Sequence, residues 1–157
     1  MVLGSIFPAN LIKVGLESED KEEAFEELVN LYVESNPAAS RSEILSSLRE
    51  RERKLSTGIK PGVAIPHTQT EQVPEVRGII GISREGLDYD ALDGRPVHVV
   101  FLLLSPPDGC ALHLRVLKRL ALLMADPSFV SSLLEQKDAS GVISTINKYE
   151  DLLATSM

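Results

Sequence analysis

Residues 97–104 form an almost uninterrupted apolar run, VHVVFLLL, in which His98 is the one polar side chain. Eight residues are far fewer than the ~20 that span a lipid bilayer, so the run predicts a strand and gives no reason to expect membrane insertion. The run shows almost no alternation of polar and apolar positions, which is typical of a strand with both faces covered. We therefore expect a core built around a central strand, with helices on both sides of its sheet.

The rest of the chain alternates between helical and strand patterns. Helices are predicted for residues 20–35, 41–55, 112–125, 127–136 and 140–149, with N-caps at Asp20, Ser40, Asp126 and Ser140. Strands are predicted for residues 62–66, which Pro66 closes, and for 76–83, with a further candidate at 11–16. There is no internal repeat or linker, and 157 residues suit one domain covering 1–157. The prediction is a single α/β domain with a mixed sheet sandwiched between helices.

The charge balance limits the classes of partner. The chain has 16 Lys and Arg against 23 Asp and Glu, a formal net charge of −7, which argues against general affinity for nucleic acids or anionic lipids. Cys110 is the only cysteine and cannot form a disulfide within the chain, and residues 1–8 lack the features of a signal peptide. We expect a soluble, cytoplasmic protein with no nucleic-acid partner.

The charges are unevenly distributed along the chain. Residues 17–27 carry seven carboxylates and one lysine, whereas residues 41–60 carry six Lys or Arg and three Glu. Charge runs usually form solvated helix faces, and that interpretation is sufficient for both segments. The second segment would also give an acidic protein a local basic patch that can bind an anion.

Arg51 interrupts the apolar face of the helix predicted for 41–55. On a helical projection it falls in the stripe formed by Ile44, Leu48 and Leu55. A guanidinium keeps its proton, so a partly buried one needs a carboxylate, carbonyl groups or an anionic ligand. Two interpretations stay open. Arg51 is either structural, in an ion pair or with its side chain extended from the helix end to solvent, or it binds an anionic ligand.

Histidines occupy two comparable positions. His113 lies in the first turn of the helix predicted for 112–125, on the core face with Leu120. A helix N-terminus favours a neutral imidazole and nearby anions, although a satisfied core histidine would explain the position equally. His67 follows Pro66 at the end of a predicted strand, where α/β sheets place ligand chemistry.

Hydroxyl groups lie beside His67. Thr68 and Thr70 add hydroxyl donors to a turn whose backbone N–H groups could surround an anion. His98 lies inside the apolar run and is interpreted as structural. A metal site on His67, His98 and His113 is an alternative, but their spacing matches no HExxH-like pattern.

Taken together, these segments resemble a known family. The similar stretches are Arg51-Glu52, residues 57–67 (TGIKPGVAIPH), residues 87–97 (LDYDALDGRPV) followed by 101–104, and His113-Leu114 at the start of a helix that ends at Asp126-Pro127. In order and spacing they are similar to the fructose, mannitol and nitrogen-regulatory EIIA domains of the bacterial phosphotransferase system. The resemblance covers about residues 9–148.

The resemblance implies a mainly parallel mixed sheet between helices and a phosphoryl-transfer function. His67 would accept the phosphoryl group, His113 would be its partner across the site, and Arg51 would stabilise the phosphoryl. The expected donor is a histidine-phosphorylated HPr-like carrier, and in a sugar transporter the acceptor is an EIIB cysteine. Members of the nitrogen-regulatory type act instead on regulatory target proteins.

Elementary chemistry agrees with this role. A neutral histidine, with an ordinary pKa near ~6.5, is a nucleophile at cytosolic pH, and Arg51 and His113 would act through fixed electrostatics. The sequence has no Walker A loop and no carboxylate pair for Mg²⁺, so we expect no nucleotide, metal or other cofactor. The lone domain favours a stand-alone regulator. The alternatives are a transporter component and an unphosphorylated protein-interaction module of the same fold.

Overall fold

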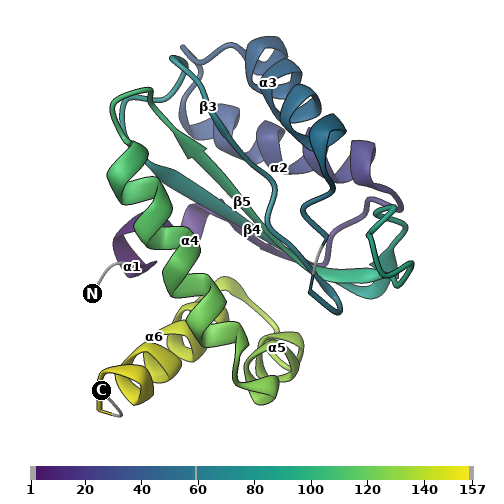
Figure 1. Cartoon of the computed structure of the whole chain (residues 1–157), viewed down its shortest axis with the longest axis vertical. Coiled ribbons are helices and arrows are strands. Elements are labelled where there is room, and N and C mark those ends of the chain that lie inside the picture. The colour runs from purple at the N-terminus through teal and green to yellow at the C-terminus, as the bar shows by residue number, and fades with distance from the viewer. Residues whose placement is uncertain (1–2, 59, 156–157) are drawn as a thin grey trace.

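A mixed β-sheet lies between two layers of helices in the computed structural model, which describes residues 3–58 and 60–155 (Figure 1). The elements follow in the order α1 (Leu3–Ile6), the 3-10 turn η1 (Ala9–Leu11), β1 (Ile12–Val14), α2 (Lys21–Ser35), α3 (Arg41–Lys54), β2 (Val63–Ala64), β3 (His67–Gln69), β4 (Arg77–Leu87), β5 (Val97–Ser105), α4 (Cys110–Met124), α5 (Pro127–Leu134) and α6 (Ala139–Thr155). Over these residues, five strands form one sheet in the order β1-β4-β5-β2, and β3 also pairs with β5.

Three of the strand pairings in this sheet are parallel. β1 runs parallel to β4, and β2 and β3 run parallel to β5. β4 and β5 are antiparallel, with Ile80 opposite Phe101. The prediction of a mixed, mainly parallel sheet between helices is therefore confirmed, and the candidate strand at 11–16 is confirmed as β1.

The apolar run of residues 97–104 forms β5, which is paired on both edges and covered on both faces. Val99, Phe101 and Leu103 pack into the core beneath α1, α4, α5 and α6. Val100 and Leu102 point the other way, into the core beneath α2 and α3. Successive side chains of a strand alternate between its faces, so a strand with a core on each side needs apolar residues at every position.

Pro66 does not end the strand as the sequence suggested. β2 and β3 flank it and pair with β5 in one unbroken register, with Val63 opposite Val99 and His67 opposite Leu103. Proline has no N–H to donate to the ladder, which explains the interruption, but its carbonyl still accepts a hydrogen bond from the N–H of Leu103 at 2.9 Å. His67 is therefore the first residue of a paired strand and not a residue beyond one.

Several predicted boundaries differ from the observed ones. The strand predicted for 76–83 extends to Leu87, and α4 begins two residues earlier than expected, at Cys110. α6 is longer than predicted, and the side chain of Asp138, not of Ser140, accepts the N–H of Gly141 in its first turn. The caps expected for three other helices are observed, at Asp20, Ser40 and Asp126.

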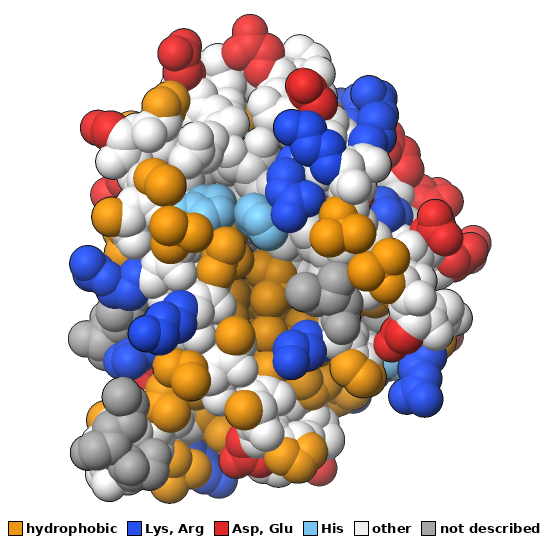
Figure 2. Space-filling model, in the orientation of Figure 1, with side chains coloured by type: hydrophobic (Ala, Val, Ile, Leu, Met, Phe, Trp, Pro, Cys, Tyr) orange, Lys and Arg blue, Asp and Glu red, His pale blue; other side chains and the backbone are white. Residues whose placement is uncertain are grey.

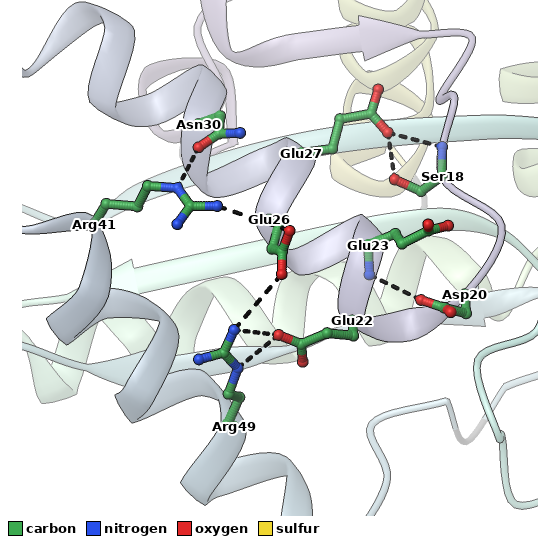
Figure 3. Close-up of polar contacts among 9 residues, drawn as sticks. All are labelled: Ser18, Asp20, Glu22, Glu23, Glu26, Glu27, Asn30, Arg41 and Arg49. Atoms are coloured by element: carbon green, nitrogen blue, oxygen red, sulfur yellow. Dashed lines mark hydrogen bonds and ion pairs between the residues drawn. The ribbon is translucent and has the colours of Figure 1, made fainter.

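The acidic segment of α2 and the basic segment of α3 partly neutralise each other. Glu22 pairs with Arg49, and Glu26 lies 3.9 Å from Arg41 and 3.8 Å from Arg49 (Figure 3). Exposed pairs of this kind contribute little to stability, so the two charge runs are mainly facing helix surfaces. Arg51, in the last turn of α3, takes no part in them.

Each helix within the described residues is too short or too polar to cross a lipid bilayer.

Candidate functional site

Three elements bring the predicted site residues together near the carboxyl end of β5. Arg51 comes from the last turn of α3, His67 from the start of β3, and His113 from the first turn of α4. The His67 and His113 rings lie with centroids 5.3 Å apart and planes at 70°. Figure 2 shows two histidine side chains in a hollow of this face, between hydrophobic side chains and Lys or Arg side chains.

His67 is held in one tautomer by a main-chain acceptor. Its Nδ1 lies 2.6 Å from the carbonyl oxygen of Ile65. A carbonyl oxygen can only accept, so Nδ1 carries the proton and donates it. In the neutral ring, Nε2 then holds the free lone pair, and it lies 3.4 Å from Nη2 of Arg51. The nitrogen of His67 whose lone pair is free for a reaction is therefore Nε2.

Among the described residues, no carboxylate forms an ion pair with Arg51. Its Nη1 donates to the carbonyl oxygen of Leu55 at 3.2 Å, and its other end faces His67. None of the ion pairs between residues of the described ranges includes Arg51. The structure of the described residues thus gives the ion-pair interpretation of this arginine no support. Leu55 is 55% exposed and not part of the apolar stripe, because α3 ends at Lys54.

His113 is buried, with 6% of its surface exposed, and it has a polar partner. Its Nδ1 forms a short hydrogen bond with the hydroxyl group of Ser105, the last residue of β5. Ser105 lies one residue beyond the apolar run 97–104, and nothing in the sequence indicated a role for it. This hydrogen bond fixes the orientation of the ring, whose plane lies at 70° to the neighbouring imidazole of His67.

Both imidazoles are neutral at pH 7. Burial lowers the pKa of His67, and the guanidinium of Arg51 lowers it further, whereas the hydrogen bond to Ile65 opposes these effects. Burial lowers the pKa of His113 to about 4, with smaller contributions from His67 and Arg51. Desolvation disfavours the imidazolium form, so each ring retains a lone pair at neutral pH.

The site opens into a cavity of about 440 Å³. Arg51, His67 and His113 line it, as does Thr68, whose hydroxyl was predicted to serve the site. The other lining residues are Ser47, Glu50, Lys54, Gln69, Cys110, Leu114 and Leu117. Thr70 does not reach this cavity: it is buried, and its hydroxyl accepts the N–H of Gln72 at 3.1 Å.

His98 lies apart from the other histidines. Its Nδ1 is 2.9 Å from the carbonyl oxygen of Ser83, toward the opposite end of β5 from the site. In the part of the chain that the structure describes, no cluster of three or more His, Cys, Asp or Glu side chains is arranged to bind a metal ion. The geometry instead combines a neutral nucleophilic nitrogen with a fixed positive charge in an open cleft, which suits transfer of an anionic group.

Most of the chain matches a known protein family. Residues 5–149 match the family model described as "Phosphoenolpyruvate-dependent sugar phosphotransferase system, EIIA 2". The chain belongs to this family. EIIA domains carry phosphoryl groups in the phosphotransferase system.

Individual relatives of this EIIA domain include transport and regulatory proteins. The PTS system fructose-specific EIIABC component of Bacillus subtilis is 31% identical over 150 residues, which cover 96% of this chain but only 24% of that protein. A nitrogen regulatory protein of Bradyrhizobium diazoefficiens is 30% identical over 93% of this chain and 95% of its own length. The crystal structure of nitrogen regulatory protein IIA-Ntr from Neisseria meningitidis has a TM-score of 0.85 and 34% identity, covering 93% of this chain and 99% of that one.

Proposed function

We propose that this EIIA domain carries a phosphoryl group on Nε2 of His67. The observation that carries the proposal is the hydrogen bond from Nδ1 of His67 to the carbonyl of Ile65, which leaves the lone pair on Nε2. That nitrogen faces Arg51, whose charge no carboxylate within the described ranges neutralises. A nucleophile and a group that stabilises negative charge are thus adjacent in one cleft.

The proposed reaction is a transfer between two histidines. The lone pair of Nε2 attacks the phosphorus of a phosphohistidine on the donor protein, a bond forms between phosphorus and Nε2, and the donor's own nitrogen–phosphorus bond breaks. The electron pair of that broken bond stays with the donor imidazole. Arg51 stabilises the charge on the phosphoryl oxygens throughout, and no metal or nucleotide is needed.

The proposed donor is an HPr-like phosphocarrier. For the fate of the phosphoryl group we favour the regulatory type, because the structure of the nitrogen regulatory protein from Neisseria meningitidis is similar over nearly the full length of both chains. A role in sugar transport, with transfer to an EIIB cysteine, is the second candidate, favoured by the fructose-specific relative at 31% identity.

Labelling with phosphoenolpyruvate, Enzyme I and the cognate HPr tests the carrier role. The wild type should gain one acid-labile phosphoryl group, His67→Ala should gain none, and the control His98→Ala should be labelled like the wild type. Stoichiometric labelling of His67→Ala would contradict the assignment. An unlabelled wild type beside a fully phosphorylated HPr would instead favour a protein-interaction module.

Mixing the phosphorylated domain with the cognate EIIB separates the two candidate roles. Rapid transfer to the EIIB cysteine would favour the transport role. A phosphorylated form that stays stable beside EIIB, and whose binding to a regulatory target differs from that of the unphosphorylated form, would favour the regulatory one.

A further inference from the structure

Glu52, the residue after Arg51 on α3, is a carboxylate that the site described above does not use. It is 7% exposed, and it lies in the last turn of the helix. Consecutive residues of a helix point about 100° apart, so while Arg51 faces His67, the side chain of Glu52 enters the core. A buried carboxylate is costly unless its oxygens are well bonded, so its partners show what it holds in place.

Both oxygens of Glu52 bind the segment that follows α3. Oε2 accepts the N–H of Thr57 at 2.8 Å, and Oε1 accepts the hydroxyl of the same threonine at 2.7 Å. Lys21 lies 3.1 Å from Oε2. The buried hydroxyl of Tyr89 lies 2.9 Å from the Thr57 hydroxyl, and it donates to Oε1 of Glu52 at 3.4 Å.

From Thr57 the hydrogen bonds continue to His67. The carbonyl oxygen of Thr57 accepts the N–H of Ile65 at 3.1 Å. The carbonyl oxygen of Ile65 accepts the Nδ1–H of His67 at 2.6 Å. Two residues thereby connect the carboxylate to the imidazole: His67 donates to Ile65, Ile65 donates to Thr57, and Thr57 donates to Glu52.

We infer that Glu52 is a positioning residue for the phosphoryl-transfer site, which fixes the carbonyl of Ile65 and so holds His67 as the Nδ1–H tautomer with Nε2 free. The inference rests on the proposed function for its effect on transfer, but the effect on the tautomer is independent of any phosphoryl group. α3 then serves both nitrogens of His67, Nε2 directly through Arg51 and Nδ1 through the chain of hydrogen bonds that begins at Glu52.

A second buried carboxylate provides a matched control. Glu150 on α6 is 2% exposed and receives a hydrogen bond from Nε of Arg119 at 3.1 Å. It belongs to the opposite helical layer, and its Oε1 has no hydrogen-bond partner among the residues that the structure describes. Replacing Glu150 perturbs a buried carboxylate without touching the path to His67, so it reveals the effect of lost stability alone.

Two substitutions at Glu52 separate the hydrogen bonds from the charge. In Glu52→Gln, one oxygen becomes an NH₂ group that cannot accept, so Thr57 loses one of its two bonds. Glu52→Asp keeps the charge but is one methylene shorter, so it cannot reach both donors. The distinction matters because the charge of Glu52 also acts on His67 through space and raises the pKa of its imidazole.

The experiment measures the tautomer of His67 from its ¹⁵N chemical shifts at pH 8, and the rate of phosphorylation by phospho-HPr under single-turnover conditions. In the wild type and in Glu150→Gln, His67 should be the Nδ1–H tautomer. In both Glu52 variants, the released ring should populate both tautomers, and the rate should fall about tenfold or more, because a small misplacement of a reacting group has effects of this size.

The inference is overturned if folded Glu52→Gln keeps the wild-type tautomer and rate. It is also overturned if Glu52→Asp behaves as the wild type while Glu52→Gln does not, because the charge alone would then explain the effect. A shift of the His67 tautomer in Glu150→Gln as large as in the Glu52 variants would overturn it as well. Should the Glu52 variants fail to fold, Thr57→Val removes one bond of the same path and must shift the tautomer in the same direction for the inference to stand. If the wild type accepts no phosphoryl group, the proposed function fails, while the tautomer measurement still tests the role of Glu52.

Discussion

The low pKa of His113 should make folding sensitive to acid. Burial holds the pKa of this histidine at about 4 in the folded state, whereas in the unfolded chain it is near the ordinary value of ~6.5. Between these two values the unfolded state binds more protons than the folded state. Stability from this group is therefore complete above pH 6.5 and decreases as the pH falls toward 4.

The size of the effect follows from the two pKa values. At pH 5 the His113 imidazole is almost fully protonated in the unfolded chain and almost fully neutral in the folded protein. One pKa unit corresponds to ~1.4 kcal/mol, so protonation favours unfolding at pH 5 by about 2 kcal/mol through this group alone. That is a large part of the ~5–15 kcal/mol stability of an ordinary domain.

Urea unfolding of the wild type and of His113→Gln, at pH 7.5 and pH 5.0, measures this contribution. Other groups also titrate in this range, so the quantity to compare is the difference between the two proteins in their loss of stability. The wild type should lose about 2 kcal/mol more than the variant. His98→Gln is the matched control, and its loss of stability between pH 7.5 and pH 5.0 should equal that of the wild type. Equal losses in the wild type and in His113→Gln would refute the reasoning.

Three further outcomes are expected. Arg51→Met should slow phosphorylation by a factor equivalent to roughly 1.5–3 kcal/mol and leave the melting temperature unchanged. The rate of Arg51→Lys should lie between those of the wild type and Arg51→Met. Rapid-quench labelling measures the rates, and thermal melts measure the stability. The labelling rate of the wild type should fall on acidification with a midpoint below the ordinary histidine value of ~6.5, because the pKa of His67 is lowered. Gly78→Ala should destabilise the protein by roughly 1–3 kcal/mol in urea unfolding, because a Cβ there overlaps the ring of Phe7.

The fold was predictable where burial alone determines the residue pattern. The run 97–104 indicated a strand covered on both faces. Alternate side chains of such a strand enter two different cores, so the residues on both faces must be apolar. α1 was missed because its four residues are too few to carry a periodic signal. The error at Leu55 has a different cause: a helical projection holds only inside a helix, and at this residue the backbone is already extended, with φ −166°.

The candidate site was predictable where a polar side chain breaks an apolar pattern, and unpredictable where its partners are distant in sequence. Arg51 and His113 stood out because each lies on the buried face of its own helix. Ser105 and Tyr89 gave no such signal, since their roles depend on tertiary contacts with residues 8 and 32 or more positions away. Glu52 lay beside Arg51 in the motif, but nothing in the sequence indicated which group it would hold.

Arg51 and His113, the two groups that flank the imidazole of His67, differ in how their own charge responds when the charge on His67 changes. Arg51 is always protonated, so it favours an anion before and after transfer. His113 is neutral while the site is free, with its pKa held at about 4. Two unit charges 5.3 Å apart, the distance between the imidazole centroids, attract by about 3 kcal/mol at an effective dielectric constant of ~20. A phosphoryl group on His67, as proposed, would therefore raise the pKa of His113 and favour a proton on it. The same proton would have to leave when the phosphoryl group departs, which couples transfer to the protonation of His113.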